Sequence, residues 1–326
     1  MRKRILTLII CMMAFSAVAS SAHAQTSLPT LPDSDALVLA NGRRLITEAL
    51  PRVLPEQTAA EMRKIVEHIK IMTGIDLAAT DMLVAALRFR NMSPTNSMPD
   101  FLLALRGSFK ANPMLKTGEE KYGAKTITIL KLAESAGPNA KVPPFLAELS
   151  LFTSDTGMLM VGSNQYVKAA IDAADGKAQI KPELSALATR DSSAMLSAAA
   201  LIPPGFIANF IPKEAHGNQD IMKMINGINR LYLSAGMGAS DFPLTLVVGT
   251  ADADQARMLG GLAEMGASLA AGSAKDKPMQ DMLRSIKVTV SGTEVQALAS
   301  APNEVVAGLL NSLFKPKPAA ATTDKK

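Results

Sequence analysis

The sequence predicts an α+β fold of two tandem similar units, each a mostly antiparallel sheet with helices on one face. Three observations predict this class. Short strand-like segments follow one another and are joined by short turns, which is typical of antiparallel pairing. Amphipathic helical segments lie between these hairpins, so each sheet should have one covered face. The order of segments in the first half is also repeated in the second half.

The chain begins with the features of a secretory signal peptide. A positive region at 2–4 is followed by an apolar run at 5–19, and a small-x-small cleavage site ends at Ala24. We expect cleavage between Ala24 and Gln25, and therefore an exported protein, periplasmic or extracellular, without a stable membrane span after cleavage. The one cysteine of the sequence, Cys11, lies in the signal, so the mature chain should have neither disulfides nor a thiol nucleophile.

Positive charge is concentrated at the two ends of the chain. The full sequence has 34 Lys+Arg and 29 Asp+Glu, a net charge of +5. The signal carries three of the basic residues, and the segment 315–326 carries four lysines and one aspartate. The body is therefore close to neutral, which argues against a nucleic-acid-binding surface. We expect 315–326, rich in Lys, Pro and Ala, to be a disordered tail.

The first unit, residues 25–176, should open with a short apolar strand at 36–40. Two helices are expected next, the first capped by Asn41 and the second, with apolar residues on one side, ending at Gly74. The other elements expected in this unit are strands at 82–90, 101–109, 126–132, 146–153 and 158–161, a turn at 154–157, and a closing helix at about 165–174.

A connector at 177–190 leads to the second unit, residues 191–314, which repeats this order. Asp252 and Gln255 have the pattern of a capping box at the start of a long helix that reaches about residue 271. The other elements expected are strands at 195–201, 231–237 and 244–250, helices near 206–211 and 221–225, a hairpin of 287–290 and 295–300 with a turn at 291–292, and a closing helix at 303–314.

Four pairs of short segments indicate that the chain contains an internal duplication. The two members of each pair share apolar positions and one or two turn-forming or polar residues, and the pairs occur in the same order in both halves. The matched segments are 45–51 with 206–212, 74–76 with 227–229, 100–105 with 241–246, and 164–167 with 303–306. The first unit has longer connections, for example at 91–99.

Several motifs carry a resemblance to a known group of proteins. They are Leu31–Val38 (LPDSDALV), Thr73–Leu77 (TGIDL), Arg106–Phe109 (RGSF), and Val161-Gly162 followed by Val167–Asp172 (VKAAID). On these motifs the first half resembles a family of uncharacterised exported bacterial proteins with a duplicated α+β unit, and the second half resembles it more weakly. The resemblance implies this fold and export. It implies no reaction, cofactor or catalytic residue.

Residues that commonly carry catalysis are sparse and isolated. His68 and His216, the histidines of the mature chain, lack the spacing of a metal site. Ser312 and Lys315 have the spacing of a Ser–Lys catalytic pair, but they lie at the end of the last expected helix, so we interpret the match as chance. No G-x-S-x-G motif is present in the sequence.

Two acidic pairs have a spacing that could suit a hard cation. They are Asp33 with Asp35 and Asp252 with Asp254. Polarity at the entry to a strand explains the first pair more simply, and the preference of carboxylates for a helix N-terminus explains the second. We therefore predict no catalytic, cofactor-binding or metal-binding residue.

Glycine and methionine suggest close packing in two places. Gly260, Gly261 and Gly266 lie inside an expected helix, where each lowers helix stability by about 1 kcal/mol relative to alanine. Close helix packing is the simpler compensation, and a ligand cleft is the alternative. Met158 and Met160 fall on one face of an expected strand, so core packing explains them better than an adaptable apolar groove.

These observations favour an exported, non-enzymatic binding or structural protein of the cell envelope. Its partner would be an envelope protein or an apolar small molecule, with no cofactor and no nucleic acid. One alternative is a carrier that holds an apolar ligand in a cleft between the two units. Another is a hydrolase whose carboxylates meet only in the folded chain.

Overall fold

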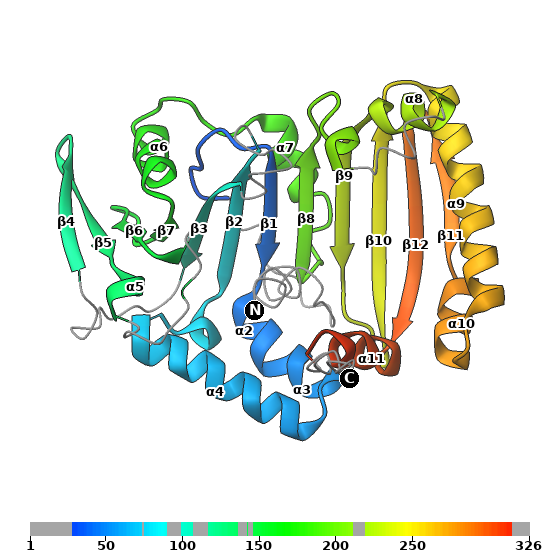
Figure 1. The fold of residues 1–326 in the computed structure, drawn as a ribbon, viewed down its shortest axis with the longest axis horizontal. Coiled ribbons are helices and arrows are strands. Elements are labelled where there is room, and N and C mark those ends of the chain that lie inside the picture. The colour runs from blue at the N-terminus through cyan, green and yellow to red at the C-terminus, as the bar shows by residue number, and fades with distance from the viewer. Residues whose placement is uncertain are drawn as a thin grey trace, which may run out of the picture.

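A computed structural model describes residues 28–73, 75–89, 99–106, 117–135, 142, 146–210 and 219–314. These residues form one 12-stranded sheet in the order β11-β12-β10-β9-β8-β1-β2-β3-β7-β6-β5-β4 (Figure 1). All the strand pairs are antiparallel, so the predicted α+β class with antiparallel sheet is confirmed. The cleavage site at Ala24 and Gln25 and the tail 315–326 lie outside the described residues.

The first half of the chain forms one side of this sheet. Its strands are β1 Ala36–Ala40, β2 Met82–Arg88, β3 Asp100–Arg106, β4 Thr117–Tyr122, β5 Lys125–Leu130, β6 Leu149–Thr153 and β7 Leu159–Gly162. Its helical elements are α2 Gly42–Arg44, the π-helix η1 Leu45–Ala49, α3 Leu50–Val53, α4 Glu56–Thr73, the 3₁₀ turn η2 Leu77–Ala79, α5 Leu132–Ser135 and α6 Asn164–Ala174.

The second half of the chain forms the other side. Its strands are β8 Leu196–Leu201, β9 Ile228–Ala235, β10 Asp241–Thr250, β11 Lys287–Ser291 and β12 Glu294–Pro302. Its helical elements, with the helix that precedes β8, are α7 Pro182–Ala188, η4 Ile207–Phe210, α8 Gln219–Gly227, α9 Ala253–Ser273, α10 Lys277–Arg284 and α11 Asn303–Phe314. In the part of the chain that the structure describes, no helix is both long and apolar enough to cross a membrane.

The two halves join in the middle of the sheet. Strands β1 and β8 pair there, with Val38 opposite Ala198. Read outward from this pair, the strand order is β1-β2-β3-β7-β6 on one side and β8-β9-β10-β12-β11 on the other, so the halves follow the same order. The first half adds the hairpin β4–β5 where the second half adds α9 and α10. A duplicated unit would produce this order, and the duplication itself stays a prediction.

The arrangement differs from the expected one because helices lie against both faces of one continuous sheet. Neighbouring residues in β2, Leu83 and Val84, are 5% and 0% exposed although their side chains point to opposite faces. We call one face the α6 face, because Leu37, Val84 and Leu102 pack there with α6 and α7. We call the other the α11 face, since α3 and α11 pack there on Phe242 and Ala301.

Several local predictions hold, and several elements were not predicted, among them the short η2 and α5. Asn41 Oδ1 accepts the Arg44 N–H at 2.9 Å, as expected of a helix cap. The final hairpin forms, but its turn is at Gly292 and Thr293, with a φ of +57° at the glycine. The structure adds α7 inside the predicted connector, the polar edge strand β4, and α10 after α9. Figure 1 shows α9 and α10 beside β11 at one end of the sheet, with β4 at the other end.

Candidate functional site

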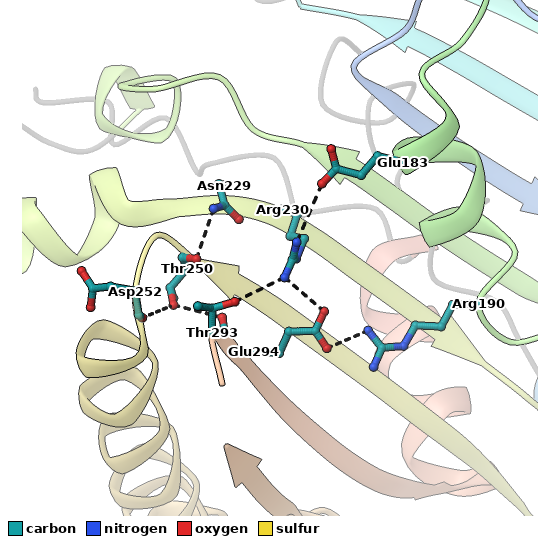
Figure 2. Close-up of polar contacts among 8 residues, drawn as sticks. All are labelled: Glu183, Arg190, Asn229, Arg230, Thr250, Asp252, Thr293 and Glu294. Atoms are coloured by element: carbon teal, nitrogen blue, oxygen red, sulfur yellow. Dashed lines mark hydrogen bonds and ion pairs between the residues drawn. The ribbon is translucent and has the colours of Figure 1, made fainter. Parts of the chain in front are cut away.

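Hydrogen bonds around Thr250 fix the start of α9 to the end of the sheet (Figure 2). The Thr250 N–H donates to Thr293 O at 2.9 Å, and its hydroxyl lies 2.8 Å from Asp252 O and 3.0 Å from Thr293 O. Asn229 Nδ2 donates to Thr250 O at 3.1 Å. Asp252 Oδ1 accepts the Gln255 N–H at 2.8 Å, so the aspartate caps the helix as predicted. Among the described residues Gln255 Oε1 has no hydrogen-bond partner, so the reciprocal half of the predicted capping box does not form. These contacts set the direction in which α9 leaves the sheet.

An ion-pair network on the α6 face joins α7 to the β11–β12 hairpin (Figure 2). Glu294 accepts a hydrogen bond from Arg190 Nη1 at 3.0 Å and lies 3.4 Å from Arg230 Nη2. Arg230 Nη1 also lies 3.7 Å from Glu183 Oε1. The Arg230 stem crosses Gly249, where a Cβ would lie 2.2 Å from Arg230 Cγ. Two cations face two carboxylates, which suits a structural clamp better than a site for a charged ligand.

A cavity of about 660 Å³ lies between α9, α10 and β11, at the outer end of the second half. We call it the outer-end cavity. Its lining residues come from these three elements and from the link between α10 and β11: Glu264, Ala267, Ser268, Ala271, Gly272, Leu283, Arg284, Ile286, Lys287 and Val288. The volume falls within the range of about 300–1,000 Å³ that is usual for small-molecule sites.

The outer-end cavity combines apolar and polar wall groups with a positively charged rim. Alanine and aliphatic side chains of α9, α10 and β11 form part of the walls, beside polar groups such as Ser268. Arg284 and Lys287 are exposed at the rim, and among the described residues neither forms a salt bridge. Glu264 is the one acidic residue of the lining. Such a site can take an apolar group and can attract a negative group at its mouth.

Carboxylates at the opposite end of the sheet are held in ion pairs that fasten the β4–β5 hairpin to α6. Lys168 Nζ lies 2.5 Å from Glu120 Oε1, and this hydrogen bond lowers the pKa of Glu120. Asp172 accepts hydrogen bonds from Lys177 Nζ at 2.7 Å and from Tyr122 Oη at 2.9 Å. The Lys177 bond is the main reason that the pKa of Asp172 is lowered. A general acid at neutral pH needs a raised pKa, so these groups fit a structural role.

A buried tyrosine anchors the start of the described chain to α6. The Tyr166 hydroxyl lies 2.5 Å from Ser34 Oγ and donates to Asp33 O at 3.1 Å. Ser34 Oγ in turn donates to Pro32 O at 2.7 Å. Burial raises the pKa of Tyr166 to about 12, although the Ser34 hydrogen bond and the nearby Arg88 guanidinium act in the opposite direction. Ser34 and Tyr166 are 1% and 0% exposed, which fits a structural role.

The acidic pairs singled out in the sequence serve local structure. Asp33 contributes backbone groups to the tyrosine anchor, and Asp35 Oδ2 accepts the backbone N–H of the residue after β2 at 2.7 Å. Asp252 caps α9, and Asp254 forms an ion pair with Arg257. Within the described ranges, no group of three His, Cys, Asp or Glu residues could hold a metal ion. The prediction that the protein has no metal site stays a prediction.

Four other candidates fall outside what the structure describes. His216 and Lys315 lie in undescribed segments. His68 and Ser312 lie in α4 and α11, and their side chains are not described. The Ser–Lys pairing therefore stays untested.

The glycines of α9 divide into two kinds, and the two methionines are core residues. A Cβ on Gly260 would lie 2.4 Å from Val290, so this glycine allows close packing of α9 on the sheet, as predicted. Gly261 and Gly266 have nothing within 4 Å of such a Cβ, so packing within the described chain does not explain them. Met158 and Met160 are both 2% exposed, which confirms core packing.

The cavity was not predicted because α10 was not predicted. Two signals for that helix were available. Pro278 stands in its first turn, where proline is favoured, and Met279, Met282 and Leu283 have helical spacing. Arg284 is the last residue of α10, and Lys287 is the first residue of β11. A prediction of α10 would therefore have placed the two cations close together.

Comparisons with known proteins indicate only a distant likeness. No protein-family model and no curated protein matches the chain. Three crystal forms of TP0453 are similar in structure. Form IV has a TM-score of 0.45 at 11% identity, covering 89% of this chain and 99% of that chain. Form III has 0.43 at 12%, covering 90% and 100%, and form I has 0.40 at 12%, covering 91% and 100%. Values this low carry no conclusion about residues or function.

Proposed function

We propose that the protein is an exported, non-enzymatic binding protein of the cell envelope, and that its ligand is an amphiphile with an anionic head. The outer-end cavity carries this proposal, since alanine and aliphatic side chains form part of its walls and its rim holds Arg284 and Lys287. The signal-like segment before Gln25 supports export. The lowered pKa values of Glu120 and Asp172 mean that these two carboxyl groups are poor general acids at neutral pH.

The position of the cavity changes the carrier hypothesis. A cleft between the two units would lie at the β1–β8 junction, where Leu37 and Val38 are 0% and 7% exposed, so that junction is packed. The outer-end cavity instead lies within the second half, between helices that the first half does not have. We therefore place the ligand at the end of the sheet and not between the halves.

Calorimetric titration of the mature chain, residues 25–326, with sodium dodecanoate tests the proposal. We expect saturable binding at one site. Ser268→Trp fills the mouth of the cavity and should abolish binding, because Ser268 is an exposed lining residue. Ser273→Trp is the matched control, since Ser273 is exposed on the same helix but is not a lining residue. Binding that survives Ser268→Trp would refute the assignment of the site.

A second pair of measurements tests the role of the rim. The double variant Arg284→Gln/Lys287→Gln should bind dodecanoate about tenfold more weakly, because a charged hydrogen bond contributes about 1.5 kcal/mol. Its affinity for 1-dodecanol, which lacks the charge, should stay the same. Lys277→Gln is the control, since Lys277 on the same helix is paired with Asp281 at 2.8 Å. An equal loss for both ligands would contradict a specific role for the charges.

A further inference from the structure

The outward side of α9 carries an exposed apolar stripe. Its four members are 41–69% exposed: Met258, Leu262, Met265 and Leu269. Their spacing of four, three and four residues places them along one side of the helix, as in the seam of a coiled coil. The opposite side, which faces the sheet, includes the buried residues Ala256, Gly260 and Ala271. The stripe therefore points away from the rest of the described chain.

Three glycines flank this stripe at 100° per residue, Gly261 and Gly272 on one side and Gly266 on the other. A Cβ on any of them would meet nothing within 4 Å in the described chain. Glycine weakens a helix interior, and it is useful where another backbone must approach closely. The sheet beneath α9 does not make that approach at these positions. They leave room for a slender object outside the described chain that lies along the helix.

We propose that this object is α9 of a second copy of the same chain, packed antiparallel about a two-fold axis. The pattern along the helix is self-complementary about the midpoint between Ala263 and Glu264. The apolar pairs brought face to face are Met258 with Leu269 and Leu262 with Met265, while Gly261 and Gly266 take the two flanks of the seam and Gly272 has no glycine opposite it. Isologous contacts of this kind are the commonest way in which identical chains form a closed dimer. This inference is independent of the proposed ligand.

Charge at the ends of α9 selects the antiparallel orientation. The same midpoint brings Asp252 of one copy level with Lys275 of the other, and both residues are exposed. A parallel pair would instead place Asp252 beside Asp252 and Lys275 beside Lys275. The helix dipoles agree with this choice, because antiparallel helices set each positive N-terminus beside a negative C-terminus. The 21-residue helix provides a seam of roughly 30 Å.

Cysteine cross-linking tests both the partner and its orientation, because the mature chain has no cysteine of its own. Met258→Cys and Leu269→Cys are made as separate variants of residues 25–326. In the antiparallel pair, two copies of one variant hold their cysteines about 16 Å apart along the seam, too far for a disulfide. An equimolar mixture brings Cys at 258 against Cys at 269. We expect disulfide-linked dimer on a non-reducing gel from the mixture and little from either variant alone.

Sedimentation velocity provides the second readout. The mature chain should show concentration-dependent dimer between about 5 and 500 μM, typical of a small helical interface. Leu262→Lys should leave it monomeric, whereas Ile65→Lys, at an apolar residue of α4 that is 41% exposed, should not. Circular dichroism confirms that both variants fold. Cross-linking of each variant with itself would overturn the antiparallel arrangement. A monomer at 500 μM with no cross-link in the mixture would overturn the dimer. Co-sedimentation of the monomer with lipid vesicles, lost in Leu262→Lys, would also overturn it, because the stripe would then be a membrane-binding surface.

Discussion

Removing one hydroxyl, in Tyr166→Phe, tests the reasoning about the buried anchor of α6. The hydroxyl proton is shared between Ser34 Oγ and Asp33 O, and Tyr166 is fully buried. Losing a buried hydrogen bond and leaving its partners less satisfied costs about 1–3 kcal/mol. We expect the free energy of unfolding at pH 8 to fall by that amount, measured by urea denaturation with circular dichroism.

The pH dependence of the same variant provides the sharper test. The folded pKa of Tyr166 is about 12, above the value of about 10 in the unfolded chain. The folded protein therefore holds more protons between about pH 10 and 12, and stability is lost as pH rises through that window. The full loss is about 2.7 kcal/mol, of which about 1.4 kcal/mol is reached at pH 11.

The expected result is that the stability difference between the natural protein and Tyr166→Phe shrinks by about 1.4 kcal/mol from pH 8 to pH 11. Ser34→Ala is the control, because it removes a hydrogen-bond partner but keeps the phenol that titrates. It should retain the alkaline loss of the natural protein. A difference that stays constant from pH 8 to pH 11 would refute the claim that burial holds the Tyr166 proton.

Two further perturbations test the sheet and its edge. Gly162→Ala should destabilise the protein by about 1–3 kcal/mol in urea denaturation, because its Cβ would lie 2.2 Å from Phe101 O. Gly118→Ala, whose Cβ would meet only ordinary contacts at 3.8 Å, should change stability by less than about 1 kcal/mol, and equal effects would contradict the packing argument. The pKa of Asp172 is lowered in the folded protein, so the natural protein should lose stability as pH falls below about 4, and Asp172→Asn should lose less. Thermal unfolding between pH 6 and pH 3 measures this, and the same fall in unfolding temperature for both proteins would contradict it.

The central strands were predictable because their own residues specify them. β1 and β2 are short, continuous apolar runs, a pattern typical of buried strands. The short turns between successive strands then favoured antiparallel pairing. That β1 and β8 join the halves into one sheet depends on pairing across more than 150 residues, which no local pattern encodes. The edge strand β4 escaped prediction because its sequence, TGEEKY, is polar. Charged residues on an edge strand discourage pairing with other chains. In β4 the same polar residues remove the apolar pattern by which a strand is predicted from sequence.

The candidate site was less predictable than the fold because it is assembled from three elements. The start and length of α9 followed from Asp252, Gln255 and the helical pattern after them. The cavity also needs α10, which has only 8 residues, and the edge strand β11. The glycines of α9 were noted in the sequence, but only the structure separates Gly260, which packs on Val290, from those that face outward.

Hydrogen exchange of a chain of residues 25–326 with and without dodecanoate measures the central claim most directly, since it reports where along the backbone the ligand acts. If the protein is a binding protein that uses the outer-end cavity, protection should increase in peptides covering 264–272 and 283–288 and stay unchanged in those covering 117–130. Protection that appears in 117–130, or no change in 264–272 at saturating ligand, would contradict it.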